Sequence, residues 1–146
     1  MSYIDRMKPP TRKPPTLSEK VEARIARLKG DVFLRADFED LGGYDQIGRA
    51  LGTLVRAEKL MKIGQGLYTR AEPSILDGEP VPVKDITTIV SEALGRIGVA
   101  TAPTRIDRAY NEGRTTQVPS GRLIGVDRRV RRKLGYGGAT VGFERV

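Results

Sequence analysis

Residues 48–68, GRALGTLVRAEKLMKIGQGLY, decide the fold that the sequence predicts. The first half of this stretch has apolar residues at helical spacing, and the second half has two short apolar runs around GQG. The runs LMKI and LYT are typical of strands, and the glycines between them indicate a tight hairpin. The stretch therefore predicts a helix that leads directly into a β-hairpin.

The predicted helix covers residues 44–57 and is amphipathic. At 100° per residue, one arc of it holds apolar side chains: Ile47, Ala50, Leu51, Leu54 and Val55. The opposite arc is polar or small: Asp45, Arg49, Gly52, Thr53 and Arg56, with Gln46 at its edge. Arginine can make bidentate contacts to guanine and glutamine to adenine, and small residues such as Gly48 and Gly52 would let the backbone approach DNA. An ordinary solvated helix face is the alternative.

Three elements are predicted upstream of this helix. Residues 16–30, TLSEKVEARIARLKG, have the capping box Thr16 and Glu19 at the start of a helix and Gly30 at its end. VFL follows as an extended piece, and Asp37 is a candidate N-cap for a short helix around residues 38–41. Helix, short strand, two helices and a hairpin is the order of a winged helix-turn-helix domain, in which the hairpin is the wing. Three side chains would then lie on or beside the wing and contact phosphate: Lys62, Gln65 and Arg70.

This run resembles the N-terminal winged helix of the AbiEi family of antitoxins and related plasmid-borne regulators. The matching positions are Arg24-Ile25, Gly30, Val32-Phe33, Asp37-Phe38, Leu41-Gly42, Ala50-Leu51, Leu54-Val55, Lys59-Leu60, Ile63, Gly66 and Tyr68. Where many relatives carry a basic residue in the wing, this chain has Gln65. A looser likeness continues to the segment TTQVP, residues 115–119. The resemblance implies a DNA-binding antitoxin whose toxin is a nucleotidyltransferase-like protein.

The composition favours a polyanionic partner and excludes several kinds of catalytic chemistry. The 146 residues include 26 Lys and Arg against 18 Asp and Glu, which gives a net charge of +8. There is no Cys and no His, so thiolate chemistry, disulfides and the commonest general base are excluded. No run approaches the roughly 18 apolar residues of a membrane span, and the N-terminus lacks the apolar centre of a signal peptide. We therefore expect a cytoplasmic protein without a cofactor or metal.

The charge is divided along the chain in a way that indicates domains. Residues 1–20, 21–70, 71–100 and 101–146 have net charges of +3, +2, −3 and +6. We predict a flexible basic arm at 1–15, where Arg12 and Lys13 could lie along phosphates, and a winged-helix domain at 16–71. The acidic, proline-rich residues 72–83 are predicted to be a linker. Residues 84–146 are predicted to be a small domain in which a helix packs on an antiparallel sheet, so the fold class is α+β.

The C-terminal region has one conspicuous cluster of cations. It consists of Arg128, Arg129, Arg131, Arg132 and Lys133. Five cations within six residues repel one another unless an anion relieves them, so we predict phosphate binding. A solvent-facing strand or turn rich in arginine is the alternative.

Together these observations predict a sequence-specific DNA-binding transcriptional regulator that represses its own toxin–antitoxin operon and is not an enzyme. Its partners would be double-stranded operator DNA and the toxin. The predicted DNA-binding residues are Tyr44, Asp45, Gln46, Arg49, Thr53, Arg56, Lys62, Gln65 and Arg70. A protein- or RNA-binding module on a winged-helix scaffold remains the alternative function.

Overall fold

The computed structural model describes residues 14–116, 122–137 and 139–146, and these form a mixed α+β fold. We call residues 14–83 the N-terminal half and residues 84–146 the C-terminal half. The N-terminal half contains α2 (Leu17–Arg27), β1 (Val32–Leu34), the 3-10 helix η1 (Arg35–Phe38), α3 (Tyr44–Arg56), β2 (Leu60–Gly64), β3 (Leu67–Pro73) and β4 (Pro80–Pro82). The C-terminal half contains α4 (Ile86–Arg96), β5 (Thr101–Ala102), α5 (Arg105–Asn111), β6 (Leu123–Val126), β7 (Gly135–Tyr136), β8 (Ala139–Thr140) and β9 (Gly142–Arg145). Arg12, Lys13 and residues 117–119 lie outside the described residues.

Local sequence signals account for most of these boundaries. Thr16 Oγ1 accepts from the backbone N–H of Glu19 at 3.2 Å, and Glu19 Oε1 accepts from the N–H of Thr16 at 3.3 Å, so the predicted capping box is confirmed. Asp85 caps α4 by accepting from Thr88 N–H, and the hydrogen bonds that it accepts from the Thr88 hydroxyl and N–H lower the pKa of Asp85. Gly66, in the turn between β2 and β3, has a φ of +72°, which glycine adopts readily.

One predicted cap is wrong. Asp37 does not begin a helix around residues 38–41; it is the third residue of η1. Its carboxylate reaches back along the chain and accepts from Leu34 N–H at 2.9 Å, so the helical turn starts at Arg35, three residues earlier than predicted. The same carboxylate forms an ion pair with Arg96 of α4, a partner 59 residues away that local sequence could not reveal.

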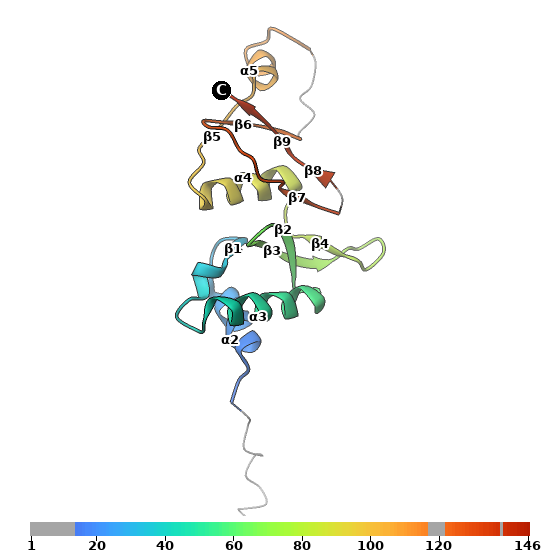
Figure 1. The fold of residues 1–146 in the computed structure, drawn as a ribbon. Helices are drawn as coiled ribbons and strands as arrows, with labels where there is room; N and C mark the ends of the chain where they lie inside the picture. The colour runs from blue at the N-terminus through green and yellow to red at the C-terminus, as the bar shows by residue number, and fades with distance from the viewer. Residues whose placement is uncertain (1–13, 117–121, 138) are drawn as a thin grey trace, which may run out of the picture.

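The first sheet has the strand order β1-β3-β2, all antiparallel, and both of its faces are buried. Side chains alternate across a strand, so neighbouring residues enter different cores. Phe33 and Tyr68 pack with α2 and α3 in what we call the helix-side core. Val32 and Leu67 pack with α4 in what we call the α4-side core. Figure 1 shows the resulting layers: α2 and α3, the first sheet, α4, and then the second sheet with α5.

The second sheet differs from the prediction in one strand direction. Its order is β5-β6-β9, and β5 is antiparallel to β6 as predicted. However, β6 and β9 are parallel, with Leu123 opposite Gly142 and Val126 opposite Arg145. A parallel pair needs a long connection between its strands. Here residues 127–141, which include the β7–β8 hairpin, supply that length.

The residues predicted as a linker, 72–83, instead extend the first sheet. The end of β3 pairs with β4, with Ala71 opposite Pro82 and Pro73 opposite Pro80. Ser74 N–H donates to the carbonyl of Glu79 at 2.7 Å and closes the hairpin. Proline lacks a donor but is tolerated on an edge strand, which is where β4 lies. The two halves are therefore joined through a shared core rather than through an extended connector.

A carboxylate reinforces the contact between the halves. Glu92 of α4 accepts two hydrogen bonds through Oε2, from Asp31 N–H at 2.8 Å and Val32 N–H at 2.7 Å. These two donors lie at the start of β1, where no strand satisfies them.

We predict that Glu92→Ala lowers the free energy of unfolding by about 2–3 kcal/mol, because two partly buried N–H groups lose their charged acceptor. Urea unfolding monitored by circular dichroism measures this change. The control is Glu39→Ala, which removes an exposed carboxylate of the same type and should have little effect. Equal effects from the two variants would show that Glu92 does not hold the halves together.

Candidate nucleic-acid interface

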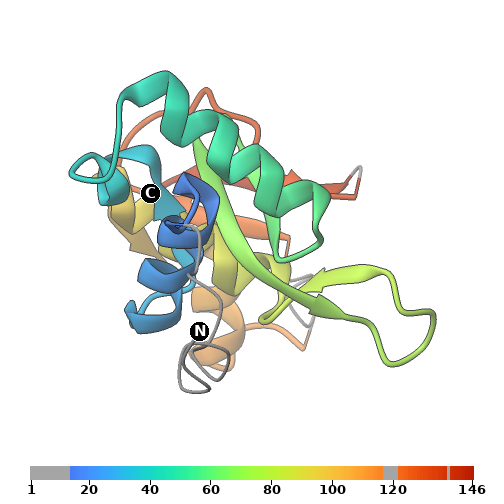
Figure 2. The ribbon, with the colours of Figure 1, turned by 90° about the horizontal axis from the view of Figure 1, so that it is seen from below.

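The outer face of α3 is an exposed polar surface of the N-terminal half. Ile47, Ala50, Leu51 and Leu54 are buried in the helix-side core, as the periodicity predicts. The residues on the opposite side are exposed: Asp45, Gln46, Arg49, Thr53 and Arg56. Figure 2 shows α3 crossing this side of the molecule with no described segment in front of it. The helix can therefore be approached by a large partner.

The charges on this face are available for a ligand. Among the described residues, neither Arg49 nor Arg56 forms an ion pair. Arg56 donates to Thr53 Oγ1 at 3.2 Å, and Thr53 Oγ1 donates to the Arg49 carbonyl at 3.0 Å. Asp45 is the one acidic residue within α3. An open cleft of about 660 Å³ runs along this face and is lined by Arg35, Asp45, Gly48, Arg49, Gly52, Thr53 and Arg56.

Four acidic residues elsewhere in the N-terminal half are paired with cations: Glu22, Asp31, Asp37 and Asp40. Arg24 bonds both carboxylate oxygens of Asp40, at 3.0 and 2.6 Å, and this hydrogen bonding lowers the pKa of Asp40. Lys59 pairs with Glu22 at 2.6 Å. These pairs neutralise charge away from α3 and leave the α3 face basic.

Gln46 has a different role from the one predicted. Its Oε1 accepts from Gly43 N–H at 3.1 Å, so the side chain caps the first turn of α3. A bidentate contact with adenine needs both the oxygen and the nitrogen of the amide. Because Gln46 Oε1 is already hydrogen-bonded to the backbone, Gln46 stabilises the start of α3 and is not available for a bidentate contact with adenine.

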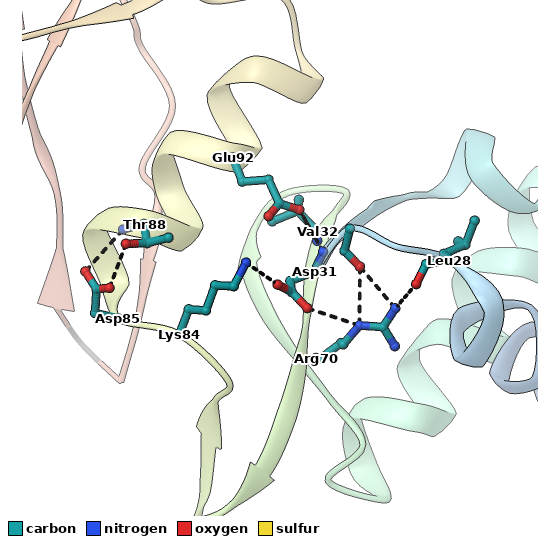
Figure 3. A network of polar contacts seen from close by, with 9 residues as sticks. Leu28, Asp31, Val32, Arg70, Lys84, Asp85, Thr88 and Glu92 are labelled. Atoms are coloured by element: carbon teal, nitrogen blue, oxygen red, sulfur yellow. Dashed lines mark hydrogen bonds and ion pairs between the residues drawn. The ribbon is translucent and has the colours of Figure 1, made fainter.

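Arg70 also differs from the prediction, because its half-buried side chain is held by neighbouring groups at the start of β1 (Figure 3). Its guanidinium pairs with Asp31 at 3.2 Å, donates to the carbonyls of Leu28 and Gly30, and lies 4.9 Å from the Phe33 ring centroid. Asp31 also binds Lys84 at 2.7 Å, and this hydrogen bond raises the pKa of Lys84. Arg70 therefore fixes the start of β1 and is not a phosphate contact, whereas Lys62 is exposed on β2.

The sequence prediction missed Arg35, which lies next to the α3 face. The guanidinium of Arg35 sits 4.3 Å from the ring centroid of Tyr44, a residue that is 71% exposed. It also covers Gly48, where a Cβ atom would lie 2.7 Å from Arg35 Cζ. Gly48 therefore makes room for Arg35, not for DNA as predicted. The signal in the sequence was the glycine inside a helix, which indicates close packing by a neighbour.

The turn of the β2–β3 hairpin contacts the C-terminal half. Leu134 is buried beside Gly64, where an added Cβ would come within 2.5 Å of Leu134 Cδ2. Arg132 donates to the carbonyl of Gln65 at 3.3 Å. The hairpin is therefore held in place by residues far along the chain, and the predicted wing does not project freely.

The predicted C-terminal cations are brought beside this turn. Arg131, Arg132 and Lys133 are exposed and line a second cleft of about 730 Å³ together with Arg35, Tyr44, Gln65 and Gly66. Arg128 pairs with Asp127 at 3.5 Å, and Arg129 is exposed outside the cleft. The five residues are exposed in the irregular connection between β6 and β7, so the alternative of a solvent-facing strand or turn holds in its turn form and not as a strand.

Comparison of the chain with family models, with curated proteins and with solved structures gives no match. Within the described part of the chain, no helix is long and apolar enough to cross a membrane.

The two glycines of α3 provide a test of the position of Arg35. At Gly52 an added Cβ meets only Arg56 Nη1 at 3.6 Å, which is an ordinary contact. We predict that Gly52→Ala raises the free energy of unfolding by about 0.5–1 kcal/mol through helix propensity. We predict a smaller gain for Gly48→Ala, because the guanidinium must leave Tyr44. Urea unfolding of both variants measures the difference, and equal gains would contradict the packing of Arg35 on Gly48.

Proposed function

We propose that the protein is a sequence-specific DNA-binding transcriptional regulator, in which residues 16–71 act as a winged helix-turn-helix. The observation that carries the proposal is the exposed face of α3, with two arginines that pair with no described carboxylate. The order α2, η1, α3 and β2–β3 hairpin supports it, since α3 occupies the position of a recognition helix.

The dimensions of α3 suit the major groove of B-DNA, which admits an α-helix. Its 13 residues extend over about 20 Å. In this proposal Arg49 contacts a base edge, with guanine as the preferred partner, and Thr53 and Arg56 line the same cleft. Tyr44 at the helix N-terminus and Lys62 on β2 are exposed, and in this proposal they contact backbone phosphate.

We propose further that this regulator is the autorepressing antitoxin of a type IV, AbiEi-like toxin–antitoxin system. The support is the resemblance of the sequence over residues 18–68, and its apolar positions form much of the helix-side core, including Ile25, Phe33, Phe38, Leu51 and Tyr68. The toxin partner would be nucleotidyltransferase-like, and both would act in the cytoplasm. Selection of genomic DNA by the purified protein tests autorepression, because the recovered motif should lie upstream of the gene itself.

One observation favours the alternative of a protein- or RNA-binding module, and specifically a protein partner. The hairpin formed by β3 and β4 carries Ile75 and Leu76 at its tip, and both side chains are fully or almost fully exposed. These two adjacent aliphatic side chains offer an apolar contact for a protein partner. This surface lies apart from the α3 face, so the two functions can be separated by variants.

We predict that Arg49→Ala weakens operator binding by about 1–3 kcal/mol, roughly 5- to 150-fold, because a bidentate base contact is lost. Fluorescence anisotropy with the selected DNA and with a scrambled duplex measures both affinity and sequence preference. Arg108→Ala is the matched control, since Arg108 is exposed on α5 at the far end of the molecule from α3 (Figure 1). The proposal is supported if Arg49→Ala loses the preference for the selected DNA over the scrambled duplex and Arg108→Ala keeps it. It is contradicted if Arg49→Ala keeps that preference.

Salt dependence separates DNA binding from protein binding. If six or more phosphates are contacted, affinity for the operator should fall by roughly 10³-fold between about 50 and 200 mM salt, because counterions are released on binding. Titrations across this range measure the slope. A nearly flat dependence would favour the protein-binding alternative.

A further inference from the structure

The cleft between the turn of the β2–β3 hairpin and the cation cluster at residues 128–133 has a charge pattern that favours binding of an anion. It is lined by seven residues: Arg35, Tyr44, Gln65, Gly66, Arg131, Arg132 and Lys133. Four of these side chains are cationic and none is acidic. We propose that this cleft binds backbone phosphates of the same duplex that α3 contacts, so that residues 131–133 form a second DNA-contacting element. This inference rests on the proposed function.

The cations of the cleft lack internal partners that would neutralise them. Among the described residues, Arg131 and Lys133 form no ion pair, and neither does Arg35. Buried Arg35 Nε has no hydrogen-bond partner. Like charges held this close repel one another, and a phosphodiester, which offers several acceptor oxygens, relieves that repulsion.

The cleft is already formed in the folded chain. Leu134, the residue after the cluster, is buried in the α4-side core, and Arg132 is bonded to the carbonyl of Gln65. These two contacts fix the path of residues 131–133 beside the hairpin turn. Because the backbone is already fixed, a ligand has to order only the side chains, which lowers the cost of binding.

The cleft is also continuous with the α3 face. Arg35 lines both clefts, and its guanidinium lies over the ring of Tyr44 at the start of α3. A duplex whose major groove holds α3 has its phosphate backbone along the edges of that groove. The turn itself contributes no cation, because it carries Gln65 and Gly66, and Arg132 brings a positive charge to it from the C-terminal half.

The test compares two double variants with identical changes in charge. Arg131→Gln with Lys133→Gln removes two cations of the cleft and keeps the Arg132–Gln65 bond. Arg128→Gln with Arg129→Gln removes two neighbouring cations that do not line it. The readout is the salt dependence of anisotropy titrations with operator and scrambled duplexes.

For the cleft variant we expect the slope of log K against log salt to become shallower by about 2, with affinity at about 150 mM salt reduced on the order of tenfold or more. The loss of affinity should be equal for the operator and the scrambled duplex, because phosphate contacts do not depend on base sequence. The control variant should keep the wild-type slope. A third double variant, Arg131→Lys with Lys133→Arg, keeps both charges and should show the wild-type slope. Urea unfolding should be unchanged for all three.

Three results would overturn the inference: a wild-type slope for the cleft variant, equal losses for the cleft and control variants, or tighter wild-type binding to single-stranded RNA than to the duplex. The first two leave the proposed function intact as long as the wild-type protein prefers its operator. If the wild-type protein shows no sequence preference, the proposed function fails, and the slope on scrambled duplex still decides whether the cleft binds phosphate.

Discussion

The first sheet is buried on both faces, and the rest of the structure depends on this constraint. A strand sends successive side chains to opposite sides, so Val32 enters one core and Phe33 the other, and Leu67 and Tyr68 do the same on β3. Removing the C-terminal half would expose the face that packs on α4. Ile63, two residues before the hairpin turn at Gln65, belongs to that face as well. The two halves therefore share a buried core, and residues of the C-terminal half hold the hairpin in place.

This arrangement separates structural charges from surface charges. Asp31, Asp37 and Glu92 all lie where β1 meets α4, and each binds a partner from another element. On the α3 face and in the adjoining cleft, the one carboxylate among the lining residues is that of Asp45. A basic protein of this size could spread its charge evenly, and then no surface would attract DNA more than another. Here the three acids are paired at internal contacts, and apart from Asp45 the charged residues that line the two clefts are all cations.

Sequence reasoning succeeded where the signal was local and failed where it was not. Thr16 with Glu19 and the apolar arc of α3 involve neighbours within a few residues, and both were predicted correctly. Arg70 was expected at the surface because its strand position suggested it, but its partner Asp31 lies 39 residues earlier. The supposed linker failed for a similar reason: prolines indicate irregular structure locally, whereas the pairing partner of β4 is decided by the sheet. The parallel β6–β9 pair equally depends on where a long connection returns.

Arg35 shows why a local weakness in α3 is retained. Glycine inside a helix costs about 1 kcal/mol relative to alanine, and Gly48 is such a residue. A larger side chain there would displace the guanidinium of Arg35 from Tyr44. An acidic residue could hold Arg35 as firmly, but it would cancel the charge that the two clefts share. An aromatic ring together with a glycine orients the cation while preserving its charge. The helix is thus less stable than it could be, and in return a positive charge is fixed between the two surfaces that the proposed function requires.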